Sequence, residues 1–474
     1  MLEIPHDIPH WLRRERKNQG EEERPYREFD VSLEHLEPSE KRAVGYLKDA
    51  TKIVGEISDI QKDTPEFSYP ADASDEELIA AFQNNDSLRS PYTRVIRKPD
   101  RSLSALPYHQ HFKVQLADIS RHVNRAADAT TDPLLKRNLH LLSEALINDR
   151  YQEQELDWVG QRRPTTINAI IGPKESYNDE KFSIKGDYLA AVGILNEPLT
   201  DKVQELIDWM VRIQRQRKDP KITARVDDTL ILAGAIKDFE WTACTYPNDP
   251  QDAKNYGSKI TIFNTMHKDV VRRKIIPTIK AIFTEDSISE FSDQELSEAS
   301  LVWLTLHEGS HPLASYPDET ERLRSYYHTV NELQCSAMGL SVAYQLYERR
   351  VLTHKQLEMV LAIHLARIFV DYGEYELQEK RSLKPYALGS VINFDYWWNQ
   401  AELKPKNGKL VLPDPEQIIG ATETLTGYLD YHARASSFTD VKSFVNRHDN
   451  FRRLSFANPA LKPIFPMDTR PLVV

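Results

Sequence analysis

Two histidines and a glutamate in the segment LHEGSH, residues 306–311, have the spacing found in zinc-dependent hydrolases. His307 and His311 are four residues apart, so a helix would place both imidazoles on one face, where they can bind one Zn²⁺ ion. Glu308 lies between them and can serve as the general base that activates water. Composition alone would produce this pattern with a probability on the order of a few per cent. The segment therefore predicts a hydrolytic zinc centre.

The residues before the motif predict the helix that must position it. Ser292 and Glu295 form a capping-box pattern, and Phe291 and Leu296 are spaced as the accompanying hydrophobic staple. A helix that starts there carries the motif in its last turns. Proline disfavours helical geometry in the residue before it, so Pro312 predicts that the helix ends at the second histidine.

Glu332 is the candidate for the third zinc ligand, which a protein zinc site needs besides two histidines. It lies in NELQCSAMG, where its helical neighbours Cys335, Ser336 and Gly339 are all small, so a second helix could approach the zinc helix closely. His328 and Cys335 are competing ligands. Glu332 could also be a solvated charge near a helix start, where the helix dipole favours acids.

A second histidine pair, His109 and His111 in YHQHF, could bind metal but has no evident third partner. The chain contains no nucleotide-binding P-loop, no GxSxG elbow and no paired CxxC motif. These absences leave the segment at 306–311 as the principal chemical signal.

Charge and composition restrict the partners and the location. The 474 residues include 61 basic and 72 acidic side chains, so an acidic surface makes nucleic acid an unfavourable partner. No apolar run is long enough to span a bilayer, and the first residues lack a secretory signal, so we expect no membrane partner. Two cysteines cannot form a disulfide framework. A cytoplasmic location follows as the expectation, with a short peptide or another small molecule as substrate.

Apolar periodicity predicts an α+β chain with more helix than strand, and the length favours two lobes over one. The first 40 residues are charged and indicate an arm. Strands are expected in PTTINAIIGP and KITIFNTM, and VINFDYWW and GKLVLP suggest a small late β element. Helices are expected at 112–127, 134–148, 201–215 and 415–433.

Several ordered stretches resemble the dipeptidyl peptidase III family, especially the short branch that includes forms fused to Nudix domains in plants. The likeness covers roughly residues 100–455. Besides LHEGSH and NELQCSA, it is carried by RYQEQELDWV at 150–159, IIGPKESYND at 170–179, ACTYPNDPQDAKNYGSKITIFNTM at 243–266 and ALGSVINFDYWWNQAELKPKNGKLVL at 387–412.

The resemblance implies two lobes around a wide cleft, a helical zinc lobe and a mixed lobe with a small β-barrel-like core. It implies an exopeptidase that releases dipeptides from the amino terminus of short peptides, with one Zn²⁺ per chain. His307, His311 and Glu332 would be the ligands, Glu308 the base, and Asn331 a side chain that supports the ligands. We expect 1–197 and 223–268 in the mixed lobe, 198–222 and 269–455 in the zinc lobe, and 456–474 as a tail.

Further site residues follow from the same resemblance. His364 would stabilise the transition state, although its helical pattern also fits a histidine satisfied within a core. Glu175, Tyr177, Asn248 and Arg367 would bind substrate. For the first three of these residues the alternative is turn chemistry, because ESYND and YPNDP both fit turns. Arg367 could instead pair with an acidic neighbour.

The chain departs from the better-known members of the family in two respects. Those members have one more residue between the two histidines of the motif. They also carry an acid and a tyrosine that contact peptides, where this chain has Asn168 and Ile170. Two alternatives therefore stand beside the peptidase: a zinc-dependent hydrolase or lyase-type enzyme acting on a non-peptide carbonyl compound, and a non-catalytic binding module stabilised by zinc.

Overall fold

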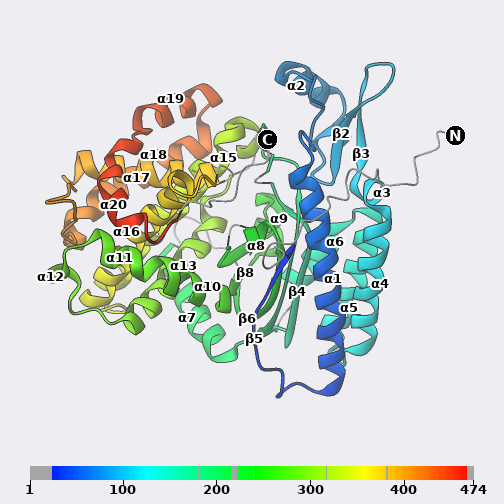
Figure 1. Ribbon diagram of the computed structural model, residues 1–474, viewed down its shortest axis with the longest axis horizontal. Coiled ribbons are helices and arrows are strands. Elements are labelled where there is room, and N and C mark those ends of the chain that lie inside the picture. Colours follow the sequence, from blue (N-terminus) through cyan, green and yellow to red (C-terminus); the bar gives the residue numbers. More distant parts are fainter. Residues whose placement is uncertain are drawn as a thin grey trace.

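The computed structural model describes residues 24–466, except 162, 177, 180, 215–220, 239, 317 and 381–382. Most of the predicted amino-terminal arm, the end of the predicted tail and Tyr177 therefore lie outside the described residues. Figure 1 shows two lobes side by side, one built on a sheet and one built of the later helices. This arrangement confirms an α+β fold with helix in excess.

A curled sheet forms the centre of the first lobe, with strand order β4-β5-β6-β8-β7 and with β1 also paired to β6. Neighbouring strands are antiparallel except β6 and β8, which are parallel. The strands are β1 (Tyr26–Glu28), β4 (Ile167–Glu175), β5 (Asp187–Leu195), β6 (Ile222–Gly234), β7 (Ala243–Tyr246) and β8 (Ser258–Phe263). In this order β7 is an edge strand, and it is the strand beside the zinc helix.

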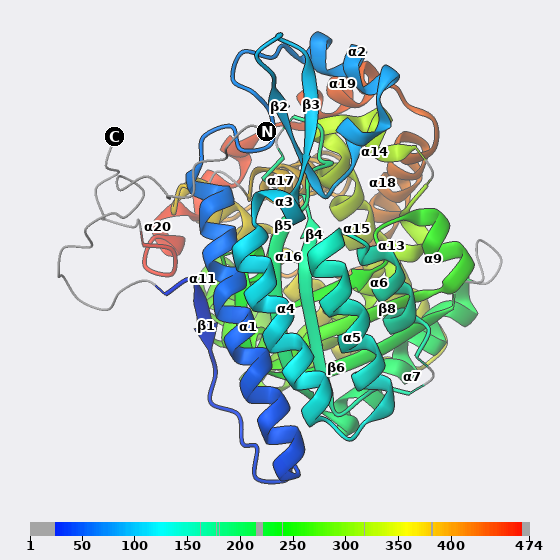
Figure 2. The ribbon, with the colours of Figure 1, turned by 90° about the vertical axis from the view of Figure 1, so that its right-hand side faces the viewer.

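Alternate residues of the central strands enter two different cores, as a pleated strand with both faces covered requires. Ile167 and Ile171 pack into the core beneath the long amino-terminal helices, whereas Ile170 joins the core that extends into the helical lobe. Figure 2 shows the amino-terminal helices covering one face of the sheet. They are α1 (Pro38–Asp63), α4 (Lys113–Ala129) and α5 (Pro133–Asn148).

The second lobe packs α13 against α15, α16 and α7. Along much of α13, α15 and α16, consecutive residues are buried, which is typical of helices covered on most sides. The principal members are α7 (Glu197–Gln214), α11 (Ile276–Ile282), α13 (Asp293–Ala314), α15 (Tyr327–Glu348), α16 (His354–Glu376), α17 (Lys384–Gln400), α18 (Pro415–Ala435) and α19 (Phe438–His448).

Short elements complete the described chain. A small hairpin unit with its own apolar cluster stands beside the cleft and contains α2 (Asp75–Asn84), β2 (Thr93–Arg97) and β3 (Leu103–Pro107). The others are α3 (Tyr108–His111), α6 (Tyr151–Val159), α8 (Ala235–Asp238), α9 (Pro250–Tyr256), α10 (Asn264–Val270), a π-helical turn (Val271–Ile275), α12 (Glu285–Ile288), α14 (Glu319–Leu323), α20 (Asn458–Leu461) and four 3₁₀ turns (Asp86–Arg89, Arg324–Tyr326, Phe451–Arg453, Ser455–Ala457).

Most predicted elements are confirmed, and two expectations are wrong. The four predicted helices correspond to α4, α5, α7 and α18, and the two predicted strands correspond to β4 and β8. VINFDYWW, however, lies within helix α17, and GKLVLP contributes isolated bridges only. Helix α17 is buried on most sides, so its apolar residues show no clear helical period. Its continuous apolar run therefore resembles that of a buried strand. The second error is that α13 continues past Pro312 to Ala314.

The predicted lobe boundaries stay a prediction. Helix α7 packs both on strand β6 and on helix α13, so it touches both lobes. Across the described ranges, none of the helices combines the length and apolarity needed to cross a membrane.

The close contact of α13 with α15 predicts that a glycine-to-alanine substitution changes thermal stability in opposite directions at Gly339 and Gly427. A Cβ at Gly339 would lie 3.1 Å from the backbone nitrogen of His307, whereas a Cβ at exposed Gly427 of α18 would meet nothing within 4 Å. Alanine is favoured over glycine in a helix by about 1 kcal/mol. Thermal unfolding should therefore show a raised Tm for Gly427→Ala and a lowered Tm for Gly339→Ala. A higher Tm for both variants would contradict the close contact.

Candidate metal centre

A capped helix carries the zinc motif, as predicted. The Ser292 hydroxyl accepts from the Glu295 backbone N–H at 3.2 Å, and the Ser292 backbone N–H donates to the Glu295 carboxylate at 3.0 Å. Helix α13 runs from Asp293 to Ala314 and carries the motif in its last turns. The four-residue spacing then places both histidines on the same face of the helix.

The end of α13 explains why the helix does not stop at His311. Pro312 has no backbone N–H, so the carbonyl of Glu308, four residues earlier, cannot receive its usual helical hydrogen bond. The Thr245 hydroxyl of strand β7 lies 3.2 Å from this carbonyl and supplies a donor instead. The helix then continues, and the Ser315 backbone N–H donates to the His311 carbonyl at 3.2 Å.

The three predicted ligand side chains come together. The donor atoms of His307, His311 and Glu332 all lie within 4.8 Å of one another, and Nε2 of His307 is 3.3 Å from Oε2 of Glu332. Two ligands about 2.1 Å from a tetrahedral zinc ion are about 3.4 Å apart, so this separation suits a shared ion. The two imidazole rings are nearly perpendicular, at 89°.

Neighbouring side chains on α15 orient both imidazoles. Nδ1 of His311 lies 3.0 Å from Oδ1 of Asn331 and 3.3 Å from Sγ of Cys335, and Nδ1 of His307 lies 3.1 Å from the Ser336 hydroxyl. An amide oxygen only accepts, so it favours the tautomer of His311 with hydrogen on Nδ1 and a lone pair on Nε2. Contacts of this kind are typical around metal-binding histidines.

The competing ligands lie elsewhere. Nε2 of His328 is 3.3 Å from the Ser176 hydroxyl. Sγ of Cys335 contacts Nδ1 of His311, the ring nitrogen that also contacts Asn331. His109 pairs with Asp149 at 2.7 Å, in the sheet lobe. Among the described residues, the one group of three potential ligand side chains is that of His307, His311 and Glu332.

Burial makes this group favourable for a cation. Desolvation raises the pKa of Glu308 to about 7 and also raises that of Glu332, while it lowers the pKa of His307 to about 4. Buried carboxyl groups beside neutral imidazoles gain stability when a positive ion balances their charge. Two imidazoles and a carboxylate are the donor set that zinc binds well, so the residues fit this metal.

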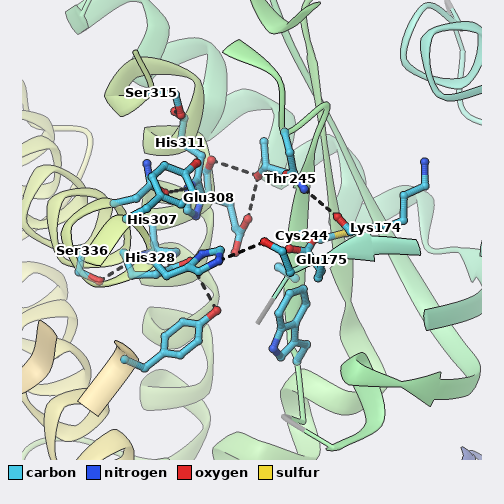
Figure 3. Close-up of a pocket in the computed structure, with 18 of the residues that line it drawn as sticks. Lys174, Glu175, Cys244, Thr245, His307, Glu308, His311, Ser315, His328 and Ser336 are labelled. Atoms are coloured by element: carbon cyan, nitrogen blue, oxygen red, sulfur yellow. Dashed lines mark hydrogen bonds and ion pairs between the residues drawn. The ribbon is translucent and has the colours of Figure 1, made fainter. Parts of the chain in front are cut away.

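The group opens into a cleft of about 630 Å³ between the two lobes. Figure 3 shows His307, Glu308 and His311 on the helical wall, facing Glu175, Cys244 and Thr245 on the strand wall. Edge strand β7 supplies residues 243–245 of that wall. The cleft is therefore lined both by helix α13 and by an edge strand of the sheet.

The predicted substrate-binding residues Glu175, Asn248 and Arg367 all line this cleft. Glu175 accepts a hydrogen bond from the Tyr246 hydroxyl at 2.8 Å, and burial raises its pKa to about 8. The Asn248 amide donates to the Lys174 carbonyl at 3.0 Å. Their contacts with substrate stay predictions.

His364 also borders the cleft but is 1% exposed. Its Nδ1 accepts from the Trp303 indole at 3.1 Å, and its Nε2 lies 2.7 Å from the Asn393 amide. Burial lowers its pKa to about 3. Both ring nitrogens therefore have protein partners, and a catalytic role for His364 stays a prediction. The Arg367 guanidinium lies 5.4 Å from the centre of the Trp303 ring.

Several side chains of the site gave no chemical signal in the sequence. Trp303 stacks on His307 with ring centres 5.2 Å apart, a contact that its position one helical turn earlier could have revealed. The Tyr386 hydroxyl donates to Glu332 at 3.5 Å, and the Thr245 hydroxyl donates to Glu308 at 2.7 Å. These two belong to other elements, so no local spacing could indicate them.

The two positions where the chain departs from better-known relatives are buried. Asn168 accepts from the Trp158 indole at 3.1 Å and donates to Asp227 at 2.8 Å, and Ile170 belongs to the core. The carboxyl group that strand β4 presents to the cleft is that of Glu175.

Comparison with known proteins agrees with this architecture. No sequence profile of a known protein family matches the chain. Nudix hydrolase 3 of Arabidopsis thaliana is 23% identical over 368 residues, which are 73% of this chain and 46% of that protein. The chain thus spans about half the length of this curated relative.

Two solved structures are similar over nearly the whole chain. Dipeptidyl-peptidase III from Corallococcus sp. strain EGB superposes with a TM-score of 0.82 at 18% identity, covering 93% of both chains. DPP III from Caldithrix abyssi gives a TM-score of 0.73 at 18% identity, covering 94% of this chain and 96% of the other. The chain therefore has the dipeptidyl-peptidase III fold, as the motifs in its sequence indicated.

Proposed function

We propose that the chain is a zinc-dependent peptidase that releases dipeptides from the amino terminus of short peptides. The observation that carries this proposal is the Glu308 carboxyl group, which lines the cleft beside three convergent ligand side chains without being one of them. A purely structural zinc site has no need of such an acid.

His307, His311 and Glu332 would hold one Zn²⁺ ion per chain. When bound, zinc acts as a Lewis acid that polarises a carbonyl group and makes water more acidic. Glu308 takes a proton from the attacking water and delivers it to the leaving amine. Asn331 and Ser336 keep the two imidazoles oriented through their Nδ1 atoms.

An extended peptide suits the cleft better than a compact molecule. Strand β7 is at the edge of the sheet, lines the cleft and contacts helix α13. The backbone of an edge strand can pair with an added peptide strand, which would bring a peptide bond into the cleft that Glu308 lines. The two similar solved structures described above are named as dipeptidyl-peptidase III or DPP III.

The cleft also has an acidic region suited to a free amino terminus. Glu155, Glu175, Asp249 and Asp252 line it, and Lys174 pairs with Glu155. The buried Glu175 carboxyl needs a nearby cation to be ionised at neutral pH, because its pKa is about 8. The ammonium group of a peptide supplies that charge.

The first prediction concerns Glu308. Glu308→Gln should keep the zinc content of the wild type but lower kcat by about 10²–10⁴-fold, because an amide cannot accept the proton. Glu298→Gln, on an exposed position of the same helix, is the matched control and should keep wild-type activity. Wild-type turnover in Glu308→Gln would remove this residue from the mechanism.

The second prediction concerns Glu175. Glu175→Gln should raise KM for peptides with a free amino terminus by about 10-fold, a typical loss for one charge-assisted contact. Exposed Glu153→Gln is the control and should leave KM unchanged. If KM is the same in all three proteins, Glu175 does not bind the amino terminus.

A substrate panel separates the proposal from its alternatives. Dipeptidyl-naphthylamides should be hydrolysed, and their amino-acetylated forms should not. Silence on all peptides with full zinc occupancy would favour a non-peptide carbonyl substrate. Loss of folding on chelation, with no turnover of any substrate, would favour a non-catalytic zinc-stabilised module.

A further inference from the structure

The hydroxyl of Thr245 contacts two parts of one residue. Its Oγ1 lies 2.7 Å from Oε2 of Glu308 and 3.2 Å from the backbone carbonyl oxygen of the same glutamate. Figure 3 shows both contacts as they cross from strand β7 to helix α13. Thr245 is half-buried and lines the cleft.

The second contact exists because of Pro312. In an uninterrupted helix the N–H four residues after Glu308 would bind the Glu308 carbonyl, and proline has no N–H to donate. The carbonyl is therefore available to a side chain from outside the helix. Thr245 occupies this place, and so its hydroxyl is held next to the carboxyl group of the same residue.

We propose that Thr245 is a positioning residue for the general base Glu308, held in register by the carbonyl group that Pro312 leaves free. This inference rests on the proposed function. A glutamate side chain has three rotatable bonds, and fixing one carboxylate oxygen against the strand wall leaves the other for the proton of water.

A hydroxyl suits this role in both protonation states of the base. It carries one hydrogen and can also accept one. When Glu308 is ionised, Thr245 donates to Oε2. When Glu308 holds the proton taken from water, its carboxyl group can donate to Oγ1, and the Thr245 hydrogen can turn to the backbone carbonyl 3.2 Å away. The carboxyl group then keeps its place throughout turnover.

The first test compares Thr245→Val, which keeps the shape but removes the hydroxyl, with Thr245→Ser, which restores it. We expect Thr245→Val to lower kcat by about 10–100-fold, with KM within about threefold of wild type and zinc content unchanged. Thr245→Ser should recover kcat to within about threefold. Unchanged kcat in Thr245→Val, or a higher KM with unchanged kcat, would overturn the proposal, since the latter indicates contact with substrate.

The second test separates positioning from helix stability. Pro312→Ala supplies a backbone N–H that can satisfy the Glu308 carbonyl within the helix. In this background Thr245→Val should cost less in Tm than in wild type, but it should still lower kcat. If Pro312→Ala also restores kcat to Thr245→Val, the threonine acts only through helix stability and the proposal is wrong.

The third test does not depend on turnover, so it also applies if the chain proves not to be a peptidase. Crystal structures of wild type and Thr245→Val should show the Glu308 carboxyl group in place in the first and displaced or in several conformers in the second. An unmoved carboxyl group would overturn the positioning role. Absence of peptidase activity in the wild type would instead overturn the proposed function.

Discussion

The close approach of helices α13 and α15 is the constraint on which the site depends. Ligands from two helices can share one ion where the helices pack against each other, and small residues at the contact let the helix axes come closer. Gly339 provides this proximity, because a Cβ there would lie 3.1 Å from the His307 backbone nitrogen. Gly309 similarly lets α7 pack against the motif, since a Cβ there would lie 2.7 Å from Sδ of Met210. The ligand geometry is thus set by residues without side chains.

The second wall of the cleft contacts the Glu308 carboxyl group. Strand β7 is positioned by its pairing with β8 and contacts α13. The bond between Thr245 and Glu308 joins this wall to the zinc helix. Pro312 appears in the sequence as a helix terminator, yet in the structure its missing N–H allows that bond to form together with the contact to the carbonyl. Thr245 therefore contacts both the carbonyl that Pro312 leaves without its helical donor and the carboxyl group of the same glutamate.

Much of the site could be predicted because its signals are local. The spacing of His307 and His311 and the capping box at Ser292 lie within one helix, and the small residues around Glu332 lie within another. Amphipathic helices such as α4 and α5 could also be predicted, because each has one buried apolar face and one polar face. The apolar period of such a helix can be read from the sequence of that segment alone.

The parts that could not be predicted depend on contacts between distant segments. Helix α17 is buried on nearly all sides, so its apolar run carries no period and was expected as a strand. Thr245 acquires its role from a carbonyl 63 residues away in the chain, and His364 acquires both its partners from other parts of the chain. Asn168 likewise proves to be part of a buried network that includes Trp158 and Asp227, which no single segment reveals.

The most direct measurement is the zinc affinity and stoichiometry of wild type beside Glu332→Ala, with Glu348→Ala at an exposed position of α15 as the control. The account predicts one zinc ion per chain in wild type and control, and an affinity lower by more than about 100-fold in Glu332→Ala, because two imidazoles alone do not complete the site. Equal zinc affinity in all three proteins would contradict the account, since the carboxylate of the second helix would then not be a ligand.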